Sequence, residues 1–398
     1  MAPRPSSSKP PALPDIAFNG LLIDGQVHDE KREPDMPFEP DHYLSRHFKT
    51  SSADLNQKLD ELVALVVPPA SQNQPLYREM LVTVMRMAQA DRSRWDAKIL
   101  LQTMREMEHA FSRLDQFKRR RKVTVFGSAR TPVEHPLYGL ARELGQTLAR
   151  YDLMVITGAG GGIMAAAHEG AGTDNSLGLN ITLPFEQHAN STVDGTDHLL
   201  SFHFFFVRKL FFIKEADALV LCPGGFGTLD ETLEVLTLVQ TGKSPLVPIV
   251  LLDEPGGSFW KDMLDFVRNQ LQDNRYILPS DMGLVRLVDN AEDAAAEINH
   301  FYGNFHSSRW LKDRFVMRMN HVLTDAAMTF MNESFADLCL EGHFEQQACC
   351  EMELDEPELQ ALPRLSFVFN GRDHGRLRQL TDFINAKEHW AASLRPDD

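Results

Sequence analysis

Short apolar runs alternate with amphipathic stretches through the middle of the chain. Each run is rich in Val, Ile or Leu and precedes a turn and a stretch with apolar residues every three or four positions. Continuous apolar strands that alternate with helices are typical of a parallel sheet covered on both faces. The pattern therefore predicts an α/β fold with a Rossmann-like doubly wound parallel sheet. Strands are expected at 123–126, 153–157, 177–183, 218–222 and 246–252, and helices at about 136–150, from 163, and at about 206–216, 228–241, 258–272 and 291–301.

An N-terminal helical region is predicted before this sheet. Residues 1–50 are rich in Pro, Ser and charge, and we expect them to be extended or partly disordered. Residues 51–118 carry helical patterns at about 54–67, 75–90 and 93–117. The last helix has an apolar stripe that favours a packed helix over a long coiled coil, with dimerisation through it as the alternative. The stripe consists of Leu100, Met104, Met107, Phe111 and Leu114.

A C-terminal α+β extension is predicted after the sheet. The Rossmann-like domain is expected to span 119–302, and the extension 303–398. Within the extension, 341–360 carry seven acidic residues and no Lys or Arg, which predicts a solvated loop. The other predicted elements are a helical stretch over about 310–339, a strand at 365–369 and a last helix at about 375–386.

Composition narrows the classes of partner. The chain has 398 residues and a formal net charge of −16, which argues against nucleic acids and anionic membranes but not against a small anionic ligand. We interpret the basic run at 118–122 as a solvated helix end. No stretch reaches the roughly 18 apolar residues of a membrane helix. The four cysteines lack metal-site spacing and do not make a disulfide framework, so we expect free thiols and a cytoplasmic protein.

Three glycines in four residues follow the predicted strand at 218–222. Gly224, Gly225 and Gly227 leave the main-chain N–H groups open to close approach, and the next helix adds unpaired donors and a partial positive charge. This arrangement suits a phosphate. A carboxylate, Glu231, lies close to the same place. Its negative charge opposes the binding of a phosphate, so its presence indicates a catalytic role. The alternative is a capping box from Thr228 to Glu231.

Two further features point to the same edge of the sheet. The glycine run at 158–162 follows a strand and opens a helix, but Ile163 stands where a dinucleotide motif needs glycine, so a phosphate loop is favoured over an NAD site. Arg208 begins the helix before the 218–222 strand and could contact a phosphate or a leaving base, with a surface arginine as the alternative. His188, His198 and His203 do not have zinc spacing, so we expect no metal.

Several motifs occur in an order that resembles the Lonely Guy family, the nucleoside 5′-monophosphate phosphoribohydrolases once described as lysine decarboxylases. The resemblance covers about 120–302 and implies that this chain is a long form of the family. The most specific motif is Pro-Gly-Gly-x-Gly-Thr-x-x-Glu at 223–231. It is supported by Phe-Gly-Ser-Ala-Arg at 126–130, the 158–164 loop, Gly-Leu-Asn-Ile-Thr-Leu-Pro at 178–184 and Arg-Lys at 208–209.

The resemblance implies hydrolysis of the N-glycosidic bond of a nucleoside 5′-monophosphate, without a cofactor, by a homodimer or higher homo-oligomer. It implies that Arg208 and Glu231 are the catalytic pair. The chain departs from the related pattern at Gly161, Ala165 and His168, where Pro, Glu and Asn are expected. The implied substrate and phosphate ligands are Gly127, Ser128, Gly160, Gly161, Gly162, Asn180, Lys209, Gly224, Gly225, Gly227 and Thr228.

A second class of function stays open at this stage. The same fold could serve as a non-catalytic carrier or sensor of a phosphorylated nucleotide or a pterin-type cofactor. The lost carboxylate at Ala165 favours this alternative, whereas the retention of both Arg208 and Glu231 favours the enzyme.

Overall fold

The computed structural model describes residues 53–91, 93–182, 188–350, 353 and 356–391. The segment predicted to be extended, 1–50, lies outside the described residues. In the part of the chain that is described, no helix is both long and apolar enough to cross a bilayer.

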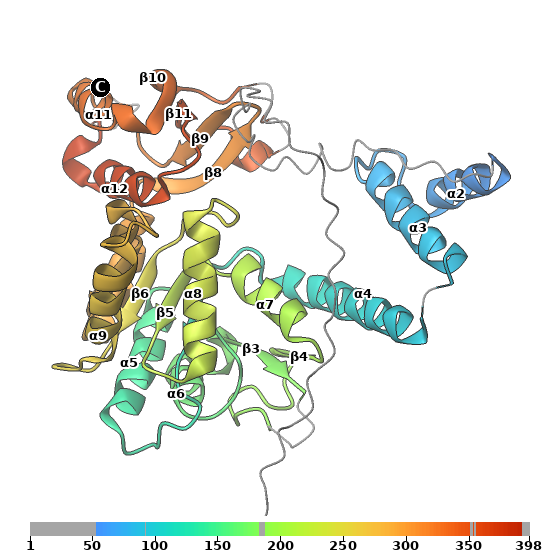
Figure 1. Ribbon diagram of the computed structural model, residues 1–398, viewed down its shortest axis with the longest axis horizontal. Coiled ribbons are helices and arrows are strands. Elements are labelled where there is room, and N and C mark those ends of the chain that lie inside the picture. Colours follow the sequence, from blue (N-terminus) through green and yellow to red (C-terminus); the bar gives the residue numbers. More distant parts are fainter. Residues whose placement is uncertain (1–52, 92, 183–187, 351–352, 354–355, 392–398) are drawn as a thin grey trace, which may run out of the picture. The chain divides into compact units, whose positions relative to one another are not determined.

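A seven-stranded parallel sheet forms the centre of the fold (Figure 1). Its strand order, β4-β3-β2-β1-β5-β6-β7, reverses direction at β1, as in doubly wound folds. The predicted fold class is confirmed, and two short edge strands, β4 and β7, are additions that the sequence did not predict. The strands are β1 (Lys122–Phe126), β2 (Met154–Thr157), β3 (Ser176–Ile181), β4 (Leu199–Phe202), β5 (Ala218–Leu221), β6 (Ile249–Leu252) and β7 (Val285–Val288).

Helices cover both faces of this sheet. Alternate residues of β1, such as Val123 and Val125, pack in one apolar cluster with three helices, while Phe126 belongs to a second cluster on the other face. Both faces of the sheet are therefore covered by apolar side chains, which explains why the strands read as continuous apolar runs. The first face carries α5 (Pro136–Arg150), α6 (Ile163–Ala171) and α10 (Ala291–Phe301), and the second carries α4 (Arg94–Leu114), α7 (Phe205–Lys214), α8 (Phe226–Gln240) and α9 (Phe259–Phe266).

The N-terminal helices match the predicted ranges within a few residues: α2 (Ala53–Val66), α3 (Gln74–Gln89) and α4. Only part of the apolar stripe on α4 is covered, because Leu114 is buried whereas Met104 and Phe111 stay exposed. The interpretation of the basic run as a solvated helix end is wrong for its second half. Lys122 is the first residue of β1 and forms a buried ion pair with Glu215 at 3.2 Å.

The C-terminal extension contains a four-stranded antiparallel sheet of order β10-β11-β9-β8. The predicted helix over 310–339 is wrong in its first half, where two strands form. The predicted loop at 341–360 is also wrong at its start, where β10 pairs with β11. The elements are β8 (Phe305–Leu311), β9 (Arg314–Met319), α11 (Asp325–Ser334), β10 (Cys339–Gln347), β11 (Arg364–Phe369) and α12 (His374–Asn385).

The extension shares its core with the parallel-sheet region. The start of α12 packs on the 3-10 turn Pro279–Leu284, where Ser280 donates a hydrogen bond to Asp373 at 2.7 Å. Trp260 and Phe301 belong to the same apolar cluster as Phe367 of β11. The packing is continuous across the predicted boundary at 302/303. The division into two domains at this point stays a prediction.

The contact between α5 and α6 makes a stability prediction possible. A Cβ added at Gly145 would overlap the carbonyl oxygen of Ala167, whereas one added at Gly139, on the same helix, would meet no described atom within 4 Å. We expect Gly145→Ala to lower the free energy of unfolding by about 1–3 kcal/mol through overpacking. Gly139→Ala should raise it by about 0.5–1 kcal/mol, because alanine favours the helix. Urea denaturation would measure both, and equal shifts would contradict the close packing.

Candidate functional site

Three loops meet at the carboxyl edge of the parallel sheet, the edge at which ligands bind in such folds. The Ser128 N–H, after β1, donates to the Pro223 carbonyl, after β5, at 3.1 Å. The Ile163 N–H donates to the Ser128 carbonyl at 3.0 Å and ties in the loop after β2. Gly162 has a φ of +60°, and a Cβ there would overlap Ser128 O. The 127–130, 158–162 and 223–227 segments therefore form one main-chain structure, which we call the cradle.

The cradle has a packed side and an open side. A Cβ at Gly224 would overlap Thr228 Oγ1 and approach Ser128 N to 2.9 Å, so this glycine is needed for close packing. Additions at Gly225 and Gly227 would meet no described atom within 4 Å. Helix α8 begins immediately after Gly225, and no described side chain caps it. Its first N–H groups therefore have no side-chain cap among the described residues, and together with the helix dipole they suit a phosphate.

Glu231 is the sixth residue of α8, so the capping-box alternative is wrong. The helix begins at Phe226, two residues before the predicted start, which places Thr228 inside the helix instead of at its N-cap. Glu231 is only 6% exposed, and its Oε2 has no hydrogen-bond partner in the part of the chain that the structure describes. Burial raises the pKa of this carboxyl to about 7, against the opposing effect of Lys209 and Arg208.

Arg208 extends from α7 toward the same place. Its guanidinium carbon lies 4.9 Å from the centre of the Phe205 ring, and its Nη1 is 3.8 Å from where a Cβ of Gly158 would stand. Its Nε is buried without a partner among the residues that are placed. Burial lowers the pKa of Arg208, and the charge of Glu231 raises it. The surface-arginine alternative is therefore wrong, because the side chain is directed at the cradle and interacts with Glu231.

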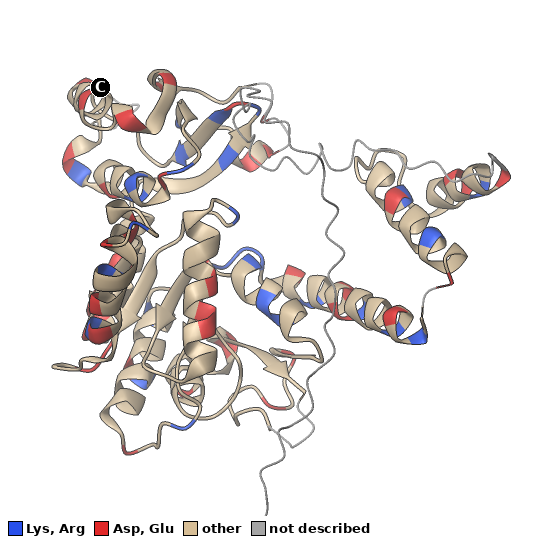
Figure 2. Ribbon diagram, viewed as in Figure 1, with Lys and Arg blue, Asp and Glu red and all other residues tan. Residues whose placement is uncertain are grey.

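Lys209 lies among the carboxylates of α8. Its Nζ is 2.7 Å from Asp230, 2.6 Å from Glu234 and 4.0 Å from Glu231 Oε2. Figure 2 shows the acidic positions of α8 near the basic ones of α7. The structure thus places this predicted phosphate ligand where it bridges α7 and α8. It also places the Asn180 side chain at the end of β3, where the oxygen accepts the Ile181 N–H at 2.9 Å.

The sequence pattern did not predict the polar network that lies behind the 158–162 loop. The Asn190 N–H donates to Ala159 O at 2.8 Å, and its side-chain amide donates to Gly160 O at 3.2 Å. Thr157 Oγ1 accepts the Ala159 N–H at 2.9 Å and lies 3.2 Å from His168 Nε2. Burial lowers the pKa of His168 to about 4, so the ring is neutral at pH 7. Nothing in the sequence around Asn190 marks this role.

The family model described as a possible lysine decarboxylase matches residues 161–298. The cytokinin riboside 5′-monophosphate phosphoribohydrolase of Mycobacterium tuberculosis is 31% identical over 177 residues, which cover 43% of this chain and 90% of that protein. A probable enzyme of the same name from Oryza sativa subsp. japonica is 28% identical over 198 residues, covering 48% and 77%.

Solved structures with a similar fold include a molybdenum cofactor binding protein from Rippkaea orientalis, with 22% identity, a TM-score of 0.32 and coverage of 45% of this chain and 93% of that one. The molybdenum cofactor carrier protein of Chlamydomonas reinhardtii has 21% identity, a TM-score of 0.31 and coverage of 45% and 96%. The match to nine tenths of the mycobacterial enzyme decides the classification. This chain belongs to the Lonely Guy family of cytokinin riboside 5′-monophosphate phosphoribohydrolases.

Proposed function

We propose that this protein hydrolyses the N-glycosidic bond of a nucleoside 5′-monophosphate to give the free base and ribose 5-phosphate. The observation that carries the proposal is Glu231, a buried carboxylate near the cradle that interacts with Arg208 and whose Oε2 has no hydrogen-bond partner among the described residues. The names of its relatives support the class of reaction. Perturbed carboxylates that serve only structure usually have hydrogen-bond partners, whereas catalytic ones are kept available for the reacting atoms.

The phosphate would bind at the open side of the cradle, on the N–H groups around Gly225 and Gly227. This remote contact supplies binding energy that orients the sugar toward Glu231. Cleavage of the C1′–N bond develops positive charge on the ribose, as in glycoside hydrolysis, and the carboxylate stabilises that charge. Ser128 and the 158–162 loop would complete the pocket wall.

Glu231 and Arg208 then act on different parts of the hydrolysis. Glu231 accepts a proton from the attacking water while the water oxygen bonds to C1′. The electron pair of the broken C1′–N bond leaves with the base, which takes up a proton. The Arg208 guanidinium stabilises the negative charge that develops on the departing base or on the phosphate. Water supplies the atoms that are added to the two products, so the reaction needs no cofactor.

The purified full chain would be tested on the purine and pyrimidine nucleoside 5′-monophosphates and on a cytokinin riboside 5′-monophosphate. We expect release of equal amounts of base and ribose 5-phosphate, and no release from the matching nucleosides, which lack the phosphate. Tight binding of a monophosphate without any release of base after long incubation would contradict the enzyme. That result would support the carrier or sensor, which the missing carboxylate at Ala165 favours.

We also propose that the protein works as a homodimer. Exposed apolar side chains gather on α7 and α8 near the cradle, among them Phe205 and Phe226, the latter 93% exposed. Apolar groups of this size on a soluble surface usually mark a contact with another chain. Sedimentation equilibrium of the full chain should give twice the mass of one chain, and a monomer at micromolar concentration would contradict the proposal.

A further inference from the structure

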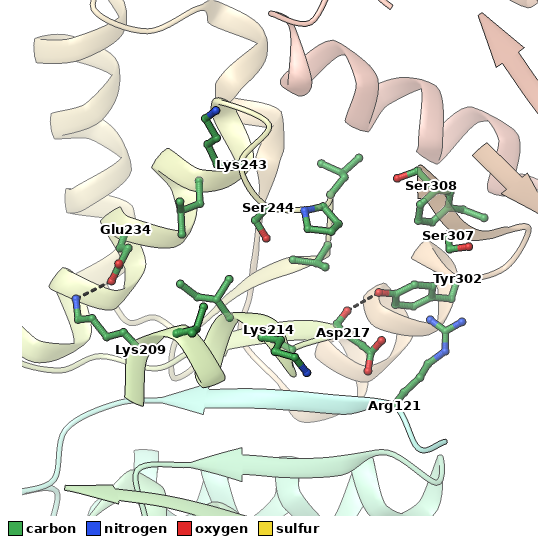
Figure 3. Close-up of a pocket in the computed structure, with 18 of the residues that line it drawn as sticks. Arg121, Lys209, Lys214, Asp217, Glu234, Lys243, Ser244, Tyr302, Ser307 and Ser308 are labelled. Atoms are coloured by element: carbon green, nitrogen blue, oxygen red, sulfur yellow. Dashed lines mark hydrogen bonds and ion pairs between the residues drawn. The ribbon is translucent and has the colours of Figure 1, made fainter. Parts of the chain in front are cut away.

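A second cavity, of about 950 Å³, lies at the amino edge of the parallel sheet (Figure 3). Arg121 directly precedes β1 and Asp217 directly precedes β5, so this cavity lies at the opposite edge from the cradle. Its other walls come from α7, the end of α8, the 243–247 loop and the start of β8. None of the described residues that line it belongs to the cradle. Its volume is within the range of small-molecule sites.

Cationic side chains outnumber carboxylates among the described residues that line the cavity. Five cationic side chains line the cavity, but only two carboxylates, Asp217 and Glu234, do so. Asp115 and Glu215, the acids that pair with two of these cations, lie outside the lining. Lys209 is likewise paired, with Asp230 and Glu234, so Arg121 is the cation on which the binding of an anion depends. The five cations are Lys118, Arg121, Lys209, Lys214 and Lys243.

Arg121 presents an unused donor at this wall. Its guanidinium carbon lies 3.5 Å from the centre of the Tyr302 ring, which fixes the plane of the group. Its Nη1 is buried and has no hydrogen-bond partner among the described residues. The Tyr302 hydroxyl is already committed, because it donates to Asp217 O at 2.6 Å. A buried donor without an acceptor is unfavourable, and an anionic ligand would supply the acceptor.

Polar and apolar groups are separated along the cavity. Figure 3 shows Ser307 and Ser308 of β8 on the same side as Arg121 and Tyr302. The rest of the wall is largely apolar and could accept a planar or hydrocarbon body. The apolar wall includes Phe206, Leu210, Ile213, Leu238, Leu246 and Phe305.

We propose that this cavity binds a phosphorylated small molecule of nucleotide size, with the phosphate at Arg121, Ser307 and Ser308 and the base on the apolar wall. The ligand is an effector, not the substrate, because the site contains no part of the cradle. The guanidinium plane supplies bidentate phosphate contacts, and the serine hydroxyls add further donors.

One cluster of ion pairs connects the wall of the cavity with Glu231, the proposed catalytic carboxylate. Lys209 and Glu234 are part of its wall, and Lys209 Nζ lies 4.0 Å from Glu231 Oε2. A bound anion would draw Lys209 away from Glu231 and weaken the ionised form of the carboxylate. Effector binding should therefore slow base release about fivefold at neutral pH, a size typical of allosteric coupling. This coupling rests on the proposed function, whereas the binding does not.

Isothermal titration calorimetry of the full chain with ADP would test the binding, in a Glu231→Gln background that prevents turnover. We expect two sites per chain, the cradle and the cavity, and weaker binding at higher salt. Ser308→Asp adds a carboxylate to the cavity wall and should weaken one of the two sites by about tenfold or more. Ser308→Asn has nearly the same shape without the charge and should keep both sites. Melting temperatures of both variants would establish that they fold.

A single site that Ser308→Asp leaves unchanged would overturn the proposal, as would equal weakening by Asp and Asn. Adenosine serves as the probe without phosphate and should not occupy the cavity. Base release by the wild-type chain is measured separately. The effector site and the nucleosidase activity can therefore fail independently, and a lost ADP site with intact base release would count only against the cavity.

Discussion

Replacing Glu231 by Gln should lower kcat for base release by about a thousandfold. The amide has nearly the same shape but can neither accept the proton of the attacking water nor stabilise a cationic ribose. Glu231 lies beyond the cradle glycines, so binding of ribose 5-phosphate should be retained. Steady-state kinetics with free base as the readout would measure the loss, and calorimetry with ribose 5-phosphate would measure the retained binding.

Asp230→Asn is the matched control, because Asp230 precedes Glu231 and also pairs with Lys209 but is largely exposed. We expect this variant to keep kcat within about threefold, since an exposed ion pair contributes little. If the two variants lose the same activity, the effect comes from the charge around Lys209 and the role assigned to Glu231 is wrong.

The pH dependence gives a second test of Glu231. Its pKa is raised from 4.5 to about 7 in the folded protein, so kcat should rise with pH through about 7 as the carboxylate forms. Because the pKa is raised, Glu231 makes a contribution to the free energy of unfolding that is fully present below about pH 4.5 and is lost as pH rises through about 7. Glu231→Gln should therefore melt higher than the wild type at pH 8 by a wider margin than at pH 4.5. A flat rate profile from about pH 5.5 to 8.5 would contradict the base role.

Arg208→Lys should lower kcat/KM by about a hundredfold or more, although the charge is kept. The lysine ammonium cannot reproduce the planar fork, which Phe205 and the Gly158 loop hold in place. The measurement is again base release under steady-state conditions.

Chemical rescue separates this role from a structural one. Arg208→Ala should regain part of its activity when guanidinium chloride is added at millimolar concentration, well below denaturing amounts. Rescue restores the charge at the cradle without restoring the packing of the side chain. Activity that is lost in Arg208→Ala and does not respond to guanidinium would indicate that the residue only maintains the fold of α7.

The parallel sheet could be predicted because its central strands are buried on both faces. Runs such as Ala218–Leu221 must then be apolar throughout, and glycine turns mark the ends of β1, β2 and β5. The edge strands β4 and β7 carry weaker signals, since Leu199 is only partly buried and Leu287 is exposed. Short edge strands form because neighbours offer hydrogen bonds, which a sequence pattern does not reveal.

The error over 310–339 has a different cause. In β9, Phe315, Met317 and Met319 face the core in a period of two, but Met and Arg are also good helix formers. Tertiary packing overrides that local preference. The site shows a similar limit: whether Glu231 caps a helix or lies buried depends on a helix start that moves by two residues.

Continuity of the core across residue 302 has a consequence for how this protein can have evolved. Phe301 and Phe305 pack in the same interior as Trp260 of α9 and Leu377 of α12. A genetic exchange that replaced the last hundred or so residues would leave these side chains facing water. The C-terminal segment and the parallel-sheet region therefore depend on each other for a water-free interior, and changes on either side of the junction must be compensated on the other.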